Sequence, residues 1–471
     1  MSKHIVVVGG GPAGYVAALH ATSLGARATL IEADSLGGTC LNRGCIPTKT
    51  LVAACSLLEG IRSAAGFGID IQGGVSARWP AMLANATRVV GGMKQGVRAL
   101  LSQRGVELVS GHARLHGERT VHVDGHGSVH GDFVLLCTGS RPVRPKAFPF
   151  DGRTVCTSDD LLQWDSLPAS IAIVGDGVIA CEFAFILNTL GVAVTIVGAS
   201  ERPAAMLDLD ISAVLGREMR KKGIRFLGGA PVEQIVAAGD GVEVRRGGGD
   251  TVKAERALVC VGRSPNTEGL QLEAAGLAVG HRGEIFVDPF MQTCAAGIYA
   301  AGDVTGRVTL AHAASAQARL AVEHMLGHAP APIDDALIPT AVFTAPEIGC
   351  VGLTEQAARA AGIEVRTGSF DTRGLGKAQA MGTLAGLTKV VADADSGRVL
   401  GVHIIGAHAS DMVHEAVAAM QYGASVDDLV ATIRAHPTLS EGLSEAAEDV
   451  FGQATHKPIA RPRGERHALA A

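Results

Sequence analysis

Two cysteines five residues apart, Cys40 and Cys45, have the clearest potential for chemistry in this sequence. They lie in the stretch GGTCLNRGCIPTK, between a pair of glycines and a proline. Such a pair can ligate a metal, form a structural disulfide, belong separately to the core, or exchange electrons as a redox pair. The choice among these four interpretations determines most of what the protein does.

The spacing restricts how the two thiols can meet. In a straight α-helix, Cα atoms five residues apart are roughly 8 to 9 Å from each other, whereas a disulfide needs a Cα separation below about 7 Å. The thiols therefore meet only if the intervening LNRG segment folds back as a turn, which Gly44 permits. Pro47 suits the first position of a helix running to about residue 63, and a helix N-terminus stabilises a thiolate.

The alternatives to a redox pair have less support. A zinc site needs four ligands, usually as two close pairs, and no second close cysteine pair exists. The nearest histidines, His122, His126 and His130, are typical of the polar face and turn of a hairpin, so we expect no metal site. The nine cysteines are an odd number, scattered along a chain without an export signal, which disfavours structural disulfides.

A candidate base lies far along the chain, in the stretch AHPTLSE. Pro437 disfavours helical geometry at His436 and predicts an exposed corner there. A histidine at such a corner can take a proton from an attacking thiol, and Glu441 can orient its ring. A structural interpretation stays open, because Thr438 and Glu441 have the spacing of a capping box for the next helix.

Two βαβ units are predicted to carry nucleotide sites, at residues 4–34 and 171–200. Each has an apolar run of strand length, a glycine turn, a helix-period stretch and a second strand. The first turn contains Gly9, Gly11 and Gly14. These glycines let the backbone approach a pyrophosphate at the helix N-terminus, and Glu32 at the end of the next strand can accept a ribose hydroxyl.

The second turn contains Gly175, Gly177 and Ala180. Its second strand ends at Gly198, where the pattern would have an acid, so the ribose carboxylate is missing. Glu201 and Arg202 could substitute from the loop, and Arg202 could equally favour a 2′-phosphate and hence NADP. The preference between NAD and NADP therefore stays open.

Later segments continue the scheme. Residues 297–306, GIYAAGDVTG, predict a strand-to-helix turn that presents Asp303 either to a sugar hydroxyl or as a helix N-cap. Residues 388–406 predict a hairpin around DADSG, and residues 409–425 predict an amphipathic helix. These last two segments indicate a separate α+β domain or an interface.

Composition narrows the class of protein. The 471 residues allow about three domains, and with 47% apolar and 18% charged residues a large core is expected. The net charge of −5 gives no basic footprint for nucleic acid. No stretch approaches the roughly 20 apolar residues of a membrane helix. We therefore expect a soluble, cytoplasmic protein that binds neither nucleic acid nor membrane.

The motifs together resemble those of the pyridine nucleotide–disulfide oxidoreductases, and the resemblance spans nearly the whole chain. In chain order they are GGGPAG, GGTCLNRGCIPTK, CTGSRP, GDGVIACE, VGRSPNT, AAGDVTG and AHPTLSE. The resemblance implies an α/β fold with two Rossmann-like dinucleotide-binding domains and a C-terminal α+β dimerisation domain. The implied boundaries are 1–149 for FAD, 150–278 for NAD, 279–337 for a return to the FAD domain, and 338–471 for dimerisation, with a mobile basic tail from about 456.

The resemblance also implies roles for individual residues. Cys40 would be the thiol that meets substrate and Cys45 the thiol next to the flavin, with His436 and Glu441 as the base and its partner from the other subunit of a homodimer. The implied FAD-binding residues are Gly9, Gly11, Gly14, Glu32, Thr39, Lys49, Ala113, Thr138, Gly139, Asp303 and Ala311. The implied NAD-binding residues are Gly175, Gly177, Ala180, Glu182 and Gly262.

Within the family, the cysteine and HPTLSE motifs are most similar to the branch that oxidises protein-bound dihydrolipoamide with FAD and NAD. Its partners would be the lipoyl domains of 2-oxo acid dehydrogenase or glycine cleavage complexes. Two alternatives stay open: a glutathione reductase-like enzyme that could use NADP, and a flavin-bearing redox-sensing or binding subunit with little turnover. Mercuric and high-molecular-weight thioredoxin reductases would need cysteines near the C-terminus, and none follows Cys350.

Overall fold

The chain forms two compact units, one of residues 1–204 with 219–335 and one of residues 205–218 with 336–471. The computed structural model describes residues 2–117 and 119–458 of this chain. Within those ranges, no helix is long and apolar enough to cross a membrane.

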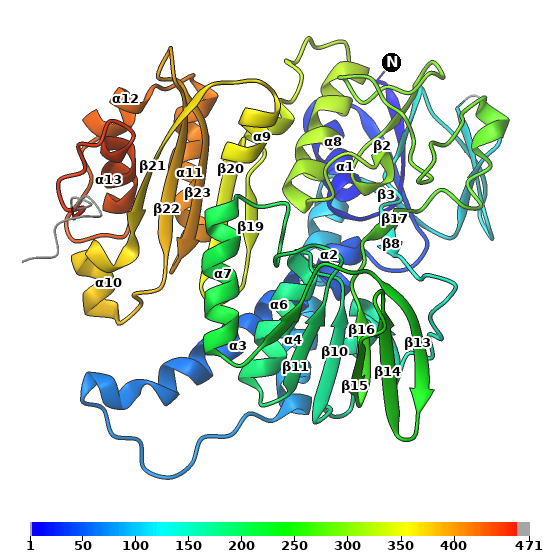
Figure 1. Ribbon diagram of the computed structural model, residues 1–471. Helices are drawn as coiled ribbons and strands as arrows, with labels where there is room; N and C mark the ends of the chain where they lie inside the picture. Colours follow the sequence, from blue (N-terminus) through cyan, green and yellow to red (C-terminus); the bar gives the residue numbers. More distant parts are fainter. Residues whose placement is uncertain (1, 118, 459–471) are drawn as a thin grey trace, which may run out of the picture. The chain divides into compact units, whose positions relative to one another are not determined.

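The first unit contains two five-stranded parallel sheets, each built around one predicted βαβ unit (Figure 1). In spatial order the first sheet consists of β18 (Ile298–Ala300), β7 (Phe133–Leu136), β1 (His4–Val8), β2 (Arg27–Glu32) and β3 (Glu107–Ser110). From Ile5 to Val8 every residue of β1 is buried, as expected of a parallel strand covered on both faces. Helix α1 (Pro12–Ser23) leaves the end of this strand and packs against α8 (Ala311–Met325).

The second sheet repeats this plan. In spatial order it consists of β12 (Arg225–Leu227), β11 (Ala193–Val197), β10 (Ser170–Val174), β16 (Arg256–Val259) and β9 (Val155–Thr157). Helix α6 (Val178–Thr189) connects β10 to β11. The central strand β10 again pairs in parallel with a neighbour on each side. Its end therefore forms a nucleotide-type turn like that of the first sheet.

Smaller sheets accompany the two parallel ones. β8 (Ser140–Pro142) pairs with β17 (Arg263–Pro265). One three-stranded antiparallel sheet consists of β4 (Ala113–Leu115), β5 (Thr120–Val123) and β6 (Gly127–His130). A second consists of β13 (Val232–Ala238), β14 (Gly241–Arg246) and β15 (Thr251–Ala254). The hairpin predicted around His122, His126 and His130 is confirmed as β5–β6. No group of three or more His, Cys, Asp or Glu residues in the described ranges is placed to hold a metal ion.

The second unit is built on an antiparallel sheet. In spatial order its strands are β19 (Thr340–Val342), β20 (Glu347–Gly352), β23 (Val399–Gly406), β22 (Leu387–Asp393) and β21 (Val365–Asp371). Val390 lies in one buried cluster with α11 (Ala409–Gln421) and α13 (Glu441–Asp449), whereas Val391 lies in another with α9 (Glu355–Ala360). The predicted hairpin at 388–406 and helix at 409–425 are confirmed as β22–β23 and α11.

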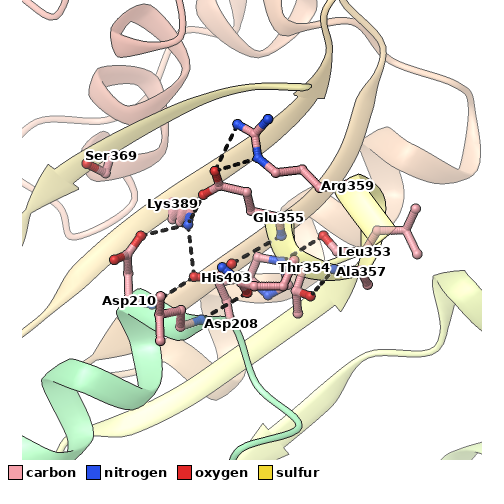
Figure 2. Close-up of polar contacts among 12 residues, drawn as sticks. Asp208, Asp210, Leu353, Thr354, Glu355, Ala357, Arg359, Ser369, Lys389 and His403 are labelled. Atoms are coloured by element: carbon pink, nitrogen blue, oxygen red, sulfur yellow. Dashed lines mark hydrogen bonds and ion pairs between the residues drawn. The ribbon is translucent and has the colours of Figure 1, made fainter. Parts of the chain in front are cut away.

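A buried lysine connects the segment 205–218 to this sheet (Figure 2). Nζ of Lys389 donates to Asp208 at 3.0 Å, to Asp210 at 2.6 Å and to Glu355 at 2.7 Å. The Lys389 side chain is 3% exposed and that of Asp208 is 0% exposed. Burial favours the neutral amine, but the three carboxylates outweigh it and raise the pKa of Lys389. The ion pair therefore compensates for burying both charges.

The remaining described elements are the longer helices α3, α4 and α7 together with short helices and turns. They are α2 (Gly38–Arg43), α3 (Cys45–Arg62), α4 (Trp79–Gln103), α5 (Ser158–Leu161), α7 (Leu209–Lys221), α10 (Gly376–Met381), α12 (Val426–Ala431), and the 3₁₀ turns Ala64–Phe67, Leu272–Ala275, Asp303–Thr305, Asp335–Leu337 and Thr372–Gly374.

Candidate active site

Cys40 and Cys45 lie on two consecutive helices that meet at Gly44. Helix α2 carries Cys40, and α3 begins at Cys45. A Cβ on Gly44 would lie 3.1 Å from the carbonyl oxygen of Thr39 and 3.4 Å from Cα of Cys40, so the glycine allows a close approach of the two helices. The LNRG segment thus folds back as expected, but within a short helix and its end rather than as a turn, and α3 starts two residues before Pro47.

The two thiols are free and are hydrogen-bonded to each other. This bond from Cys40, with the positive charge of Lys49, outweighs burial and lowers the pKa of Cys45 to about 7. Because Cys45 is the first residue of α3, the helix N-terminus also favours its thiolate. The same bond raises the pKa of Cys40. The reduced pair therefore combines a thiolate at Cys45 with a protonated thiol at Cys40.

Lys49 connects the cysteine helix to the second parallel sheet. It follows Cys45 by one helical turn and so lies on the same face of α3. Its Nζ donates to both carboxylate oxygens of Glu182, at 2.9 and 2.8 Å. Glu182 is buried on α6, and its negative charge opposes ionisation of Cys45. The family resemblance implies that Lys49 lies near the flavin and its partner Glu182 beside the nicotinamide, and the structure joins the two residues in one ion pair.

The first glycine turn has little space for side chains. Gly9 has φ +102°, and a Cβ there would lie 2.3 Å from the carbonyl oxygen of Cys137. A Cβ on Gly14 would lie 1.7 Å from the carbonyl oxygen of Gly9. Helix α1 begins after Gly11 with no side chain capping it, so its first backbone N–H groups are available to an anion. The turn therefore fits a pyrophosphate.

The second glycine turn has nearly the same backbone. Gly175 has φ +113°, and a Cβ there would lie 2.3 Å from the carbonyl oxygen of Cys260. Gly177 precedes α6 with φ −76° and ψ −177°, compared with −72° and −172° for Gly11. Ala180, fully buried, takes the position that Gly14 has in the first turn. A second pyrophosphate fits here, since α6 also lacks a side-chain cap.

Glu32 lies at the end of β2 beside the first turn. One carboxylate oxygen accepts the Gly10 N–H at 2.6 Å, and the other accepts the N–H groups of Asp34 at 2.7 Å and Ser35 at 3.1 Å. These bonds hold the carboxylate at the place where the motif would have a ribose.

Thr138 and Gly139 follow β7 and are tied to Asn266. Thr138 Oγ1 donates to the carbonyl oxygen of Asn266 at 2.6 Å, and the Asn266 N–H donates to Gly139 at 2.9 Å. Gly262, with φ +114°, follows β16 and accepts from the N–H of Val143 at 3.0 Å. These contacts connect the turn that follows β7 of the first parallel sheet with the segment that follows β16 of the second.

Asp303 begins a 3₁₀ turn just after β18, and Gly302 is the residue that precedes this turn. Oδ2 of Asp303 accepts from Oγ of Ser140 at 2.5 Å and lies 3.8 Å from Nε of Arg263. The N-cap alternative is therefore wrong. The sequence analysis missed Ser140 and Arg263, although the related stretches TGSRP and VGRSP were a signal that they pair.

Three further predicted FAD-binding residues lie at element ends. Thr39 is on α2 beside Cys40, Ala113 is the first residue of β4, and Ala311 is the first residue of α8. Their contacts with a cofactor stay predictions.

His436 is held by Glu441 in the second unit. Nδ1 of His436 lies 2.8 Å from Oε1 of Glu441, and Oε2 of Glu441 accepts the Thr438 N–H at 2.8 Å. The His436 side chain is 76% exposed. Burial of Glu441 opposes its ionisation, but the bonds from Thr438 and His436 lower its pKa. The expected capping box is only half formed, because α13 starts at Glu441 itself and the Thr438 hydroxyl donates to Ala435.

The basic tail is described only at its start. His456 Nδ1 lies 2.6 Å from Glu445, and Lys457 pairs with Asp449 at 2.5 Å. The rest of the predicted mobile tail, residues 459–471, lies outside the described residues.

Comparisons with known proteins agree with this geometry. A family model described as pyridine nucleotide-disulphide oxidoreductase matches residues 3–318, and the model of that family's dimerisation domain matches residues 338–447. A curated relative named dihydrolipoyl dehydrogenase from Bacillus subtilis is 38% identical over 469 residues, covering 96% of this chain and 98% of the relative. A protein of the same name from Thermus scotoductus is 37% identical, with 96% and 98% covered.

Solved structures show the same fold. The crystal structure of LpdA from Mycobacterium tuberculosis has a TM-score of 0.88 and 31% identity, covering 95% of this chain and 99% of that one. The HOCl-induced flavoprotein disulfide reductase RclA from Escherichia coli has a TM-score of 0.85 and 28% identity, with 94% and 99% covered. Together these matches confirm the predicted fold class, with two dinucleotide-binding domains and a C-terminal dimerisation domain.

Proposed function

Since this chain belongs to the pyridine nucleotide–disulphide oxidoreductase family, we propose that it oxidises protein-bound dihydrolipoamide to lipoamide and passes the electron pair to NAD⁺. The observation that carries the proposal is the Cys40–Cys45 pair, in which Cys45 begins a helix and the hydrogen bond from Cys40 lowers the pKa of the Cys45 thiol. The choice of substrate is supported by relatives named dihydrolipoyl dehydrogenase along almost the whole chain.

The cysteine pair exchanges a disulfide with the substrate. In the oxidised protein a thiolate of dihydrolipoamide attacks Sγ of Cys40, a mixed disulfide forms, and the Cys40–Cys45 bond breaks. Cys45 leaves as a thiolate, which its lowered pKa favours. The second substrate thiol then attacks the substrate sulfur of the mixed disulfide, which releases Cys40 and lipoamide. Two electrons and two protons have left the substrate.

His436 takes the proton of the attacking thiol. Glu441 holds Nδ1 of the ring, so Nε2 is the nitrogen that accepts the proton. We propose that His436 acts on the cysteine pair of the second subunit, in the homodimer that the dimerisation-domain match supports.

Members of this family use FAD and NAD(H). We assign FAD to the first glycine turn and NAD to the second, because both turns have open helix N-termini and no space for side chains at their first glycines. FAD, when bound, relays the electron pair from the cysteines to NAD⁺, so that dihydrolipoamide and NAD⁺ give lipoamide, NADH and one proton. Lys49 and its partner Glu182 would lie between the two sites, near Cys45.

We further propose the domain boundaries stated from the sequence: FAD binding by 1–149 and 279–337, NAD binding by 150–278, and dimerisation by 338–471. Supporting them, β9, β10, β11, β12 and β16 form a separate sheet within the middle range. The proposed partners are lipoyl domains of 2-oxo acid dehydrogenase or glycine cleavage complexes, and the proposed location is the cytoplasm. Co-purification of the tagged chain with a lipoylated protein from the soluble fraction would test both.

An anaerobic titration of the purified FAD-loaded protein tests the activity. Dihydrolipoamide should bleach the flavin absorbance, and NAD⁺ added afterwards should yield one NADH per dithiol consumed. Cys40→Ser and Cys45→Ser should each abolish the bleaching, whereas Cys294→Ser, at an exposed cysteine outside the site, should not. Bleaching by NADPH and reoxidation by glutathione disulfide, with no response to dihydrolipoamide, would instead indicate a glutathione reductase-like enzyme.

A further inference from the structure

The two glycine turns correspond residue by residue, and this correspondence locates a carboxylate that the sequence pattern lacks. The N–H of the first glycine of each turn donates to a carbonyl oxygen at the end of the following strand. Gly9 donates to Ile31, the last residue but one of β2, at 2.8 Å, and Gly175 donates to Val197, the last residue of β11, at 2.9 Å. Glu32 and Gly198 directly follow these acceptors, so they occupy equivalent positions beside the turn.

The middle residues of the two turns are also equivalent. The carbonyl oxygen of Gly10 accepts from the N–H of Gly37 at 2.8 Å, and that of Asp176 accepts from the N–H of Ala204 at 2.7 Å. Gly37 has φ +91° and Ala204 has φ +48°, so the loop residue that donates to the middle carbonyl has a positive φ in both turns.

The side chains at these two positions are exchanged between the turns. In the first turn the middle residue is Gly10 and the acid Glu32 follows the strand; a Cβ on Gly10 would lie 3.0 Å from Oε2 of Glu32. In the second turn the acid is the middle residue, Asp176, and Gly198 follows the strand. A Cβ on Gly198 would lie 2.5 Å from Oδ2 and 2.6 Å from Cβ of Asp176. Each turn thus has space for one side chain between the two positions.

The two carboxylates accept hydrogen bonds from equivalent backbone N–H groups. Oε1 of Glu32 accepts the N–H of Asp34 at 2.7 Å, and Oδ2 of Asp176 accepts the N–H of Ser200 at 2.7 Å. Asp34 and Ser200 each lie two residues past the equivalent position, Glu32 or Gly198. The carboxylate of Asp176 therefore occupies the place that the strand-end acid occupies in the first turn, although it comes from the opposite side.

We propose that Asp176 supplies the ribose-facing carboxylate of the second nucleotide site and so makes this site select NAD⁺ over NADP⁺. The inference rests on the proposed function in one respect, that NAD(H) binds at this turn. A carboxylate there accepts a hydrogen bond from the ribose hydroxyl of NAD⁺ and repels the 2′-phosphate of NADP⁺ at the same place. The proposal assigns this selection to Asp176 rather than to Glu201 or Arg202, the loop residues that the sequence offered as substitutes.

Calorimetric titration of the FAD-loaded protein with NAD⁺ and with NADP⁺ tests the proposal without measuring turnover. Asp176→Asn keeps the shape and can still accept from Ser200, but it loses the charge. Losing a charge-assisted hydrogen bond should weaken NAD⁺ binding roughly 10- to 100-fold, and the preference for NAD⁺ over NADP⁺ should fall at least tenfold. The matched control, Glu201→Gln, removes a nearby acid and should change that preference less than twofold.

Exchanging the side chains provides a second test that does not depend on the fold of one variant. Asp176→Gly combined with Gly198→Glu recreates the arrangement of the first turn and should restore the preference for NAD⁺. Gly198→Ala should destabilise the protein where Asp176 is present and be tolerated in the Asp176→Gly background. An unchanged preference in Asp176→Asn, or a lost preference in Glu201→Gln, would overturn the proposal. Failure of dihydrolipoamide to reduce the wild-type flavin would overturn the proposed function alone, because nucleotide affinity is measured separately.

Discussion

Nδ1 of His436 lies 2.8 Å from Oε1 of Glu441, and this contact fixes which ring nitrogen can act as a base. Because the pKa of Glu441 is lowered, its carboxylate is ionised at neutral pH and accepts the Nδ1 proton. The second oxygen of the same carboxylate is held by the Thr438 N–H, so the ring is oriented by a group that is itself fixed. In the proposed mechanism, Nε2 is therefore the nitrogen that accepts the thiol proton.

His436→Ala should lower the rate of flavin reduction by dihydrolipoamide roughly 10²- to 10⁴-fold, the usual contribution of a general base. Rapid-mixing measurements of the flavin absorbance give this rate directly. His414→Ala, which removes an exposed histidine from α11 in the same unit, is the matched control. A rate near that of the wild type in His436→Ala would make His436 a loop residue only.

Glu441→Gln should lower the same rate by a smaller factor, about tenfold, since it acts through the histidine rather than on the substrate. In the double variant with His436→Ala the losses should not add, because the positioning residue has nothing left to position. Fully additive losses would contradict this role. Unchanged affinity for FAD would show that the fold is intact.

Lys49→Met should raise the pKa of Cys45 above its value of about 7, because it removes a positive charge and leaves Glu182 without this cation. Fewer Cys45 side chains would then be thiolates at neutral pH, and alkylation there should slow and recover at higher pH. The rate of iodoacetamide labelling of Cys45 against pH, followed by mass spectrometry, measures this shift. Lys222→Met breaks an ion pair with Glu59 farther along α3 and should not move the midpoint.

Gly44→Ala should impair formation of the Cys40–Cys45 disulfide, since the new Cβ would lie 3.1 Å from the Thr39 carbonyl oxygen and would press α2 away from α3. The equilibrium with a glutathione redox buffer measures the effect, and the disulfide should form less readily than in the wild type. Gly60→Ala, on the same helix with no atom within 4 Å of the new Cβ, should instead stabilise the protein by about 0.5–1 kcal/mol. Equal disulfide formation in both variants would contradict the packing argument.

Much of the fold follows from local patterns in the sequence. The two βαβ units were predictable because buried parallel strands and glycine turns leave a strong signal, and the hairpin at β22–β23 because its β-branched strands flank a turn sequence. The half-formed capping box was not, since the spacing of Thr438 and Glu441 does not show that α13 begins at Glu441 itself. Asp176 was missed for a similar reason: its side chain meets Gly198 across 22 residues, and a pattern that counts along one strand registers only a missing acid.

Lys389→Met should lower the free energy of unfolding by about 3–5 kcal/mol, because it leaves the buried carboxylate of Asp208 without its cation. Burial opposes ionisation of Asp208, but Lys389 lowers its pKa. The stabilisation is therefore present above the unfolded pKa of about 3.9 and is lost as the pH falls through the lower folded value. Denaturant unfolding at several pH values should show the wild type and the variant converging below about pH 4, whereas the exposed Lys377→Met should match the wild type throughout.

The same ion pair has a consequence for the order in which the protein is made. Asp208 and Lys389 are 181 residues apart, and a ribosome that adds about 5–20 residues per second needs roughly 10–40 s to translate the chain between them. Throughout that interval the segment 205–218 has been synthesised, but the lysine that pairs with the Asp208 carboxylate has not. A chain released early, before Lys389, would carry Asp208 with no such cation, so truncated translation products should be targets for chaperones and proteases.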